Sequence, residues 1–280
     1  MKSGARVTSR LGEAGPPGQG GDVDLRAVAD FKVLDESDDW IIVDKPAPLI
    51  VHPANGKIEA NLLGGVEVLL SYEMETGAAL SIITRLDRET SGIVLIAKHR
   101  LAARDLGWIF ERRQARKEYL AIVHGWPEQD EWICAAPIIR RGEVEASEIW
   151  LRQIVHQDGK DCETRFRVEQ RISRHGRPLS LIRCFPRTGR MHQIRVHLAL
   201  GGHPIVGDKL YSGDGGEYLE WIATGWTEGL AERLLLDRHA LHAARLSIPW
   251  GGGELTWHSP LARDLQAFLD GGIAIGPGTR

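Results

Sequence analysis

Four charged residues lie between two apolar runs in the stretch ITRLDRETSGIVLIAK, residues 83–98: Arg85, Asp87, Arg88 and Glu89. An isolated buried charge costs several kcal/mol, so these side chains cannot all be buried without partners. If residues 84–88 are extended, Arg85 and Asp87 project to one face while Leu86 points into the core, and ETSG forms a tight turn. An aspartate held near arginines stays ionised and acts as a nucleophile or a base. On these residues alone, a purely structural Arg–Asp bridge is the alternative.

A second stretch, FPRTGRMHQIRVHLALGGHPIVGD at 185–208, places Arg187 and Arg190 on a turn directly before a helix. Basic side chains beside a helix N-terminus suit anions. His192 and Arg195 are three residues apart and share a helix face. A buried Arg195 needs a carboxylate partner, and Asp87 is a candidate. The alternative is an amphipathic helix with a solvated basic stripe.

Tyr119 follows four cations in RRQARKEYLAIVHGW and precedes an apolar strand. An aromatic ring beside basic residues can stack on a nucleic-acid base, although such a tyrosine is more often a core residue with a polar tip. In VDKPAPLIVHP, residues 43–53, Lys45 or His52 could contact a ligand. We favour a proline-stiffened connection that supports the site.

The net charge of −3 hides a strong asymmetry along the 280 residues. Residues 165–197 contain nine arginines and a single acid, Glu169, while acids gather around 34–40 and 213–237. A concentrated basic surface holds phosphates locally even on a mildly acidic protein, because salt screens distant charges. A solvated, salt-bridged face explains the charge pattern equally well.

Other features of the composition exclude several classes. The sequence has no apolar run long enough for a transmembrane helix and no secretory signal, so a cytoplasmic protein is expected. Three widely spaced cysteines and scattered histidines argue against disulfides and against any metal site.

Strands dominate the expected structure, and they are predicted at 40–46, 92–98, 118–125, 164–172, 179–185 and 240–249. Helices are predicted at 100–114, 191–202 and 259–272. In TRFRVEQRI, Phe166 and Val168 face one side of the strand while Arg165 and Arg167 face the other. The expected fold class is α+β: a mixed, mostly antiparallel sheet with flanking helices and an active-site cleft across the sheet. We expect a disordered tail at 1–22, one catalytic domain at 23–270 and a flexible C-terminus at 271–280.

Four of these stretches together resemble the RluA-type pseudouridine synthases. The motifs IIVDKPAPLIVHP, RLDRETSGIVLIAK, KEYLAIVHG and PRTGRMHQIRVHLALGGHPIVGD occur in that family's order, and the likeness extends from Trp40 to about residue 250. Thr84 stands where the family usually has His, and Pro48 where it usually has Gly. Residues 212–236 form a segment longer than the family core needs.

The resemblance implies isomerisation of uridine to pseudouridine within RNA, without cofactor or metal. It makes Asp87 the essential aspartate, Tyr119 the tyrosine beside the target base and Arg195 the ion-pair partner of Asp87, and Arg85 would fill the stack left by the flipped uridine. The expected substrate is a ribosomal or transfer RNA stem-loop, read by a monomer without an obligate protein partner or a membrane. The remaining expected RNA contacts are Arg88, Arg165, Arg167, Arg174, Arg187, Arg190 and His192.

Two other functions share parts of this pattern. In an RNA-binding module, Asp87 would only brace Arg195, and no modified uridine would form. In an N-glycosidase, the same carboxylate would act with water as acceptor, and free uracil would be released. The product therefore discriminates among the three.

Overall fold

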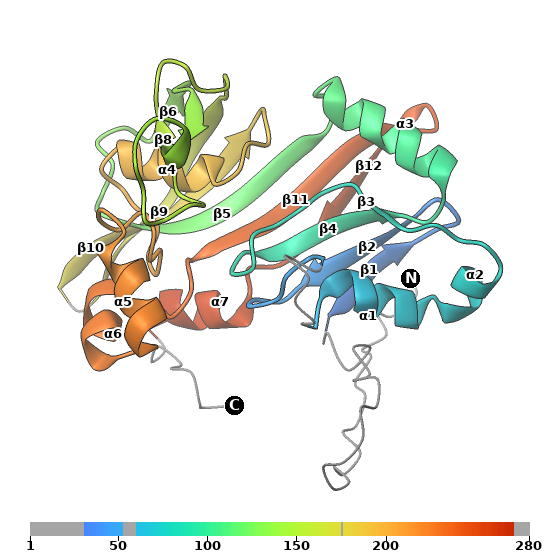
Figure 1. Cartoon of the computed structure of the whole chain (residues 1–280). Coiled ribbons are helices and arrows are strands. Elements are labelled where there is room, and N and C mark those ends of the chain that lie inside the picture. The colour runs from blue at the N-terminus through green and yellow to red at the C-terminus, as the bar shows by residue number, and fades with distance from the viewer. Residues whose placement is uncertain (1–30, 53–59, 175, 272–280) are drawn as a thin grey trace, which may run out of the picture. The chain divides into compact units, whose positions relative to one another are not determined.

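The computed structural model describes residues 31–52, 60–174 and 176–271 (Figure 1). The chain divides into two compact units, residues 1–112 and 113–280. The predicted tail at 1–22 lies outside the described residues, as does the expected flexible end beyond residue 271. The single catalytic domain expected at 23–270 stays a prediction.

The first unit has an antiparallel sheet built on the most apolar strands of the chain. β1 (Lys32–Glu36) pairs with β2 (Trp40–Lys45), β2 pairs with β4 (Ser91–Ala97), and the short β3 (Ser81–Ile82) pairs with β4. All seven residues of β4 are buried, as the uninterrupted apolar run predicted. Full burial of a Val, Leu or Ile side chain contributes about 1.5–3 kcal/mol to the stability of the fold. β2 and β4 therefore fix the ends of the loops that connect to them.

Three helices accompany this sheet: α1 (Leu62–Leu69), α2 (Ser71–Glu75) and α3 (Arg100–Glu111). The side chain of Asn61 caps α1 by accepting from the N–H of Gly64 at 3.0 Å. Leu62 and Val66 of α1 pack with β2 and β4 in one core cluster. Only α3 was predicted from the sequence.

The second unit has a larger sheet whose strands follow the order β12–β11–β5–β10–β9–β6, with antiparallel pairs throughout. The strands are β5 (Arg116–His124), β6 (Glu131–Cys134), β9 (Thr164–Arg174), β10 (Arg177–Pro186), β11 (Leu241–Trp250) and β12 (Gly253–His258). A separate hairpin joins β7 (Ile138–Arg140) to β8 (Gln153–Val155). The predicted α+β class with a mostly antiparallel sheet is confirmed.

The helices of the second unit are α4 (Gln193–Leu200), α5 (Gly216–Thr224), α6 (Glu228–Leu234) and α7 (Arg263–Leu269). Ile194 and Leu198 of α4 and Leu265 and Phe268 of α7 complete the core under β5 and β10. The long segment at 212–236 forms α5 and α6 (orange in Figure 1), which an ion pair between Arg233 and Glu220 connects.

The segment carrying α5 and α6 also covers a buried lysine. Lys209 is 3% exposed, and its ammonium lies 5.1 Å from the Trp221 ring centre and 5.8 Å from that of Trp226. Cation–π contact of this kind stabilises a desolvated charge by about 2 kcal/mol. Within the described ranges, no helix is long and apolar enough to cross a membrane.

Candidate active site

Asp87 lies on a turn that the first unit holds tightly from one side. β3 ends at Ile82, and residues 84–88 follow it outside any strand. The N–H of Leu95 in β4 nevertheless donates to Thr84 Oγ1 at 2.9 Å, and Leu86 packs on the core as expected. The Thr90 N–H closes a turn on the Asp87 carbonyl at 3.1 Å, two residues before the predicted ETSG turn, whose Ser91 and Gly92 belong to β4. Asp87 itself is half-buried.

Lys45 holds the same turn from the other side. Its side chain is fully buried, and its ammonium donates to the carbonyls of Pro46, Leu49 and Arg88 at 2.9, 2.7 and 3.2 Å. The N–H of Leu49 also donates to the Arg88 carbonyl at 2.9 Å. A buried ammonium with three acceptors is well satisfied, so Lys45 ties the 46–49 segment to the residue after Asp87. This geometry agrees with the supporting role expected for that loop.

Arg195 lies in α4 of the second unit and is 5% exposed. Its Nε and Nη2 donate to Oδ2 and Oδ1 of Asp208 at 2.7 and 2.9 Å. Burial by itself raises the pKa of the Asp208 carboxyl, but the charge and hydrogen bonds of Arg195 outweigh it and hold that pKa below its ordinary value. The sequence interpretation proposed Asp87 as the carboxylate partner and missed Asp208. The pairing of Arg195 with Asp87 stays a prediction.

The Asp208 backbone is placed by Gly207. Gly207 has φ +77°, and a Cβ there would lie 1.9 Å from the Arg238 carbonyl oxygen. Only glycine therefore permits this close approach before the buried carboxylate. The N–H groups of Leu210 and Tyr211 donate to Asp208 Oδ1 at 3.0 and 3.2 Å, which fixes the carboxylate as well.

Tyr211 links this ion pair to His192. The Arg195 guanidinium lies 5.0 Å from the Tyr211 ring centre, and the Tyr211 hydroxyl lies 2.8 Å from His192 Nδ1. The same hydroxyl accepts from the N–H of Gln153 at 2.9 Å. His192, with φ +56°, is half-buried at the start of α4. The Tyr211 hydroxyl occupies Nδ1, so the predicted contact of His192 with RNA would use the rest of the imidazole ring.

Tyr119 lies in the middle strand β5, opposite Cys184 of β10 and Ala243 of β11. It is half-buried and packs against the core of the second unit. Lys117, two residues earlier, shares its face of the strand and donates to the Thr188 carbonyl at 3.1 Å. Burial lowers the pKa of Lys117 to about 8. The sequence interpretation did not single out this lysine, although it lies within the basic run before Tyr119.

Gln193 braces the loop that carries Arg187 and Arg190. It is 3% exposed, and its Oε1 accepts from Thr188 Oγ1 at 2.7 Å and from the Arg190 N–H at 3.0 Å. Its Nε2 donates to the Glu163 carbonyl at 2.9 Å. Arg187 and Arg190 are exposed on this braced loop, as a residue that contacts RNA must be. Arg85 and Arg88 are exposed as well.

The solvent face of β9 is basic but partly neutralised. Arg165 and Arg167 are exposed, and the Arg165 guanidinium lies 4.4 Å from the Phe185 ring centre. Arg167 and Arg183 both pair with Glu169, at 2.7 and 3.1 Å. The alternative of a salt-bridged face therefore describes part of this surface. On this face, Arg165 is the strongest candidate for contact with an RNA phosphate.

Arg174 does not lie on that face, which corrects its expected role as a backbone contact. It is 9% exposed, its guanidinium lies 4.3 Å from the Phe268 ring centre, and Nη1 donates to the Phe268 carbonyl. Arg174 lies two residues from Ile172, which packs on the core. The strand therefore turns Arg174 toward α7.

Comparison with known proteins identifies the family. The family profile described as RNA pseudouridylate synthase matches residues 39–200. The chain is 36% identical over 244 residues to the ribosomal large subunit pseudouridine synthase D of Nitrosomonas europaea. That alignment covers 85% of this chain and 64% of the relative, so the chain spans less than two thirds of the relative's length. Ribosomal large subunit pseudouridine synthase C of Escherichia coli (strain K12) is 35% identical over 247 residues, with 88% and 70% covered.

Solved structures share the fold. Human RNA Pseudouridylate Synthase Domain Containing 4 superposes with a TM-score of 0.65 at 23% identity, covering 85% of this chain and 91% of its own. Human RNA Pseudouridylate Synthase Domain Containing 1 gives 0.61 at 22% identity, covering 90% and 96%. The likeness to RluA-type enzymes is confirmed, and the chain belongs to the RNA pseudouridylate synthase family.

Proposed function

We propose that this protein isomerises uridine to pseudouridine in ribosomal RNA, with Asp87 as its essential carboxylate. The observation that carries the proposal is that Asp87 lies inside the family match on a turn held by Thr84, Lys45 and the apolar strand β4. The names of the matched bacterial relatives favour ribosomal over transfer RNA.

The reaction breaks the N1–C1′ bond of uridine, turns the base and joins C5 to C1′. The proton on C5 leaves to solvent, and N1 gains one, so nothing is oxidised or reduced. An ionised Asp87 can attack C1′, stabilise positive charge there or take the proton from C5. Each route requires a charged carboxylate at a fixed position, which the two-sided support of the turn supplies.

The base must first leave the RNA stack, which costs a few kcal/mol. Arg85 is exposed two residues before Asp87, where it can enter the vacated position. Tyr119 presents a half-buried ring for the base to rest on while it turns. Arg195 supplies a positive charge whose direction the Asp208 carboxylate fixes. As the family resemblance implies, the proposal also pairs the Arg195 guanidinium with Asp87 during the reaction.

The product distinguishes this function from its rivals. Purified protein is incubated with ribosomal RNA from a strain lacking the gene, and the RNA is digested to nucleosides and chromatographed. Pseudouridine in the digest supports the proposal. Free uracil indicates an N-glycosidase, and tight binding without either product indicates a binding module.

A further inference from the structure

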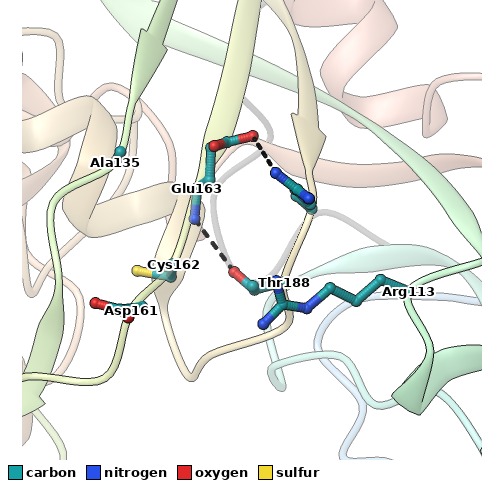
Figure 2. A pocket seen from close by; sticks show the side chains of 7 residues that line it. Arg113, Ala135, Asp161, Cys162, Glu163 and Thr188 are labelled. Carbon is teal, nitrogen blue, oxygen red and sulfur yellow. Dashed lines mark hydrogen bonds and ion pairs between the residues drawn. The ribbon is translucent and has the colours of Figure 1, made fainter.

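The second unit contains a cavity of about 270 Å³ whose lining has charges of both signs (Figure 2). Two arginines, Arg113 and Arg187, and two carboxylates, Asp161 and Glu163, contribute to it. Figure 2 shows the Arg113 side chain extending toward the loop that carries Thr188. Arg187 is one of the RNA contacts expected from the sequence, whereas Arg113, Asp161 and Glu163 were not predicted as contacts.

The wall of the cavity is built on fixed backbone. Thr188 is buried, and its hydroxyl is held by Gln193 at 2.7 Å and accepts from the Glu163 N–H at 3.3 Å. Lys117 holds the Thr188 carbonyl from the side of β5. Thr188 therefore forms a rigid part of the wall, and the charged side chains of Arg113, Asp161 and Arg187 are exposed around it.

Arg113 reaches the cavity from a strained backbone. Its φ is +58°, a conformation that costs a residue other than glycine about 1–2 kcal/mol. Arg113 directly follows Arg112, the C-cap residue of α3, where a left-handed residue commonly ends a helix, and β5 begins three residues later.

The lining selects a ligand that carries both an anionic group and hydrogen-bond donors. A bare phosphate would meet the two carboxylates, and a bare cation would meet the two arginines, so each is disfavoured. Arg187 and Glu163 are 3.8 Å apart, a loose pair that a ligand can separate. Burial raises the pKa of the Cys162 thiol to about 11, so that side chain contributes no charge to the cavity.

A nucleotide with an exocyclic amino group meets both requirements. Its phosphate pairs with arginine, and its amino group donates to a carboxylate, as Asp and Glu accept from the amino group of cytosine. Uracil has a carbonyl at that position and would place an acceptor against a carboxylate. The lining therefore favours cytidine over uridine.

A hydrogen bond links the cavity loop to β5, the strand that carries the proposed base-binding tyrosine. Lys117 bonds to the cavity loop, and Tyr119 lies two residues farther along the same face of β5, about 7 Å away along the strand. We propose that the cavity binds a nucleotide neighbouring the target uridine, with its phosphate on Arg113 and Arg187 and its base amino group on Asp161 or Glu163. The inference rests on the proposed function in taking RNA as the ligand.

The test compares the binding of two fluorescein-labelled oligonucleotides of equal length, oligocytidylate and oligouridylate, by fluorescence anisotropy. The full-length chain carries Asp87→Asn, so that no turnover occurs and the readout does not depend on catalysis. The proposal predicts that oligocytidylate binds about tenfold more tightly, the worth of one good amino–carboxylate contact. Replacing both carboxylates, Asp161→Ala with Glu163→Ala, should bring the ratio close to one. The lost negative charge affects both probes alike, so the ratio isolates base recognition.

A second variant tests the phosphate contact. Arg113→Gln should weaken both probes by the same factor and leave their ratio unchanged, whereas Arg263→Gln, an exposed arginine on α7, should change neither. Equal affinities in the parent protein, or a preference that survives loss of both carboxylates, would overturn the proposal while leaving the synthase activity intact. Absence of binding to either probe would overturn this proposal, whereas the synthase activity is decided separately by pseudouridine in digested ribosomal RNA.

Discussion

Arg195 and Asp208 form a two-point ion pair inside the second unit, with Nε–Oδ2 and Nη2–Oδ1 distances of 2.7 and 2.9 Å. The Asp208 side chain has no exposed surface, and that of Arg195 is 6% exposed. Removing one partner of such a pair leaves an uncompensated buried charge. The proposed catalytic arginine is therefore held by a residue thirteen positions farther along the chain.

Asp208→Asn is expected to lower the free energy of unfolding by about 3–5 kcal/mol, because Arg195 stays buried without its counter-charge. Urea denaturation followed by circular dichroism measures the loss. Glu232→Gln, an exposed substitution on α6, is the matched control and should stay within about 0.5 kcal/mol of wild type. Equal denaturation midpoints for the two variants would contradict the stabilising role of the Arg195–Asp208 ion pair.

Thr84→Val should destabilise the chain by about 1–3 kcal/mol, because the buried N–H of Leu95 loses its 2.9 Å acceptor. Thr84→Ser keeps the hydroxyl and should restore most of the loss. Thermal unfolding of the three proteins measures the effect. If the serine variant falls as far as the valine variant, methyl packing rather than the hydrogen bond holds the segment before Asp87.

The lowered pKa of Lys117 predicts that the free energy of unfolding depends on pH. Its pKa in the folded protein is about 8, below the ordinary 10.5, so between these values the unfolded chain binds more protons than the folded one. Stability therefore rises with pH in this window, by about 1–3 kcal/mol relative to Lys117→Met, which cannot titrate. Urea unfolding from pH 7.5 to about 10.5 measures the difference between the two proteins.

Lys160→Met replaces an exposed lysine of the same unit and is the control for that series. Its stability should run parallel to wild type over the whole pH range. A Lys117→Met curve that is also parallel to wild type would contradict the lowered pKa.

Arg165 and Arg174, on one strand, should respond in opposite ways. Arg165→Met should reduce the salt dependence of RNA binding by about one counterion and leave stability near wild type. Arg174→Met should leave the salt slope unchanged and lower the unfolding midpoint, because Arg174 stacks on Phe268 of α7. Binding isotherms at several salt concentrations, together with denaturation curves, check both. A reduced salt dependence of RNA binding for Arg174→Met would show that Arg174 contacts RNA after all.

Local pattern predicted the long strands well, because apolar alternation and uninterrupted apolar runs decide them before any tertiary contact forms. The run at 92–98 is β4, and the alternation at 164–172 is β9 with Phe166 inward. Arg174 lies two residues from the inward Ile172, so its phase along the strand, rather than its charge, indicates its burial.

The site residues that the sequence analysis missed share a different property. Asp208 and Gln193 act through side-chain partners that are fixed only once the segments before α4 and after it have folded back onto that helix. Lys117 acts on the backbone of a loop seventy-one positions away in sequence. No periodicity marks such contacts. The helices α5 and α6 were not predicted either, because their segment was interpreted only as an insertion of unknown role.

The most direct test of the account is release of tritium from ribosomal RNA labelled at C5 of uridine, by wild-type protein and by Asp87→Asn. The RNA comes from a strain lacking the gene, and both proteins are first matched for RNA affinity and for unfolding midpoint. We predict release by wild type and none above background by Asp87→Asn. Equal release by the two proteins would show that Asp87 is not the essential carboxylate.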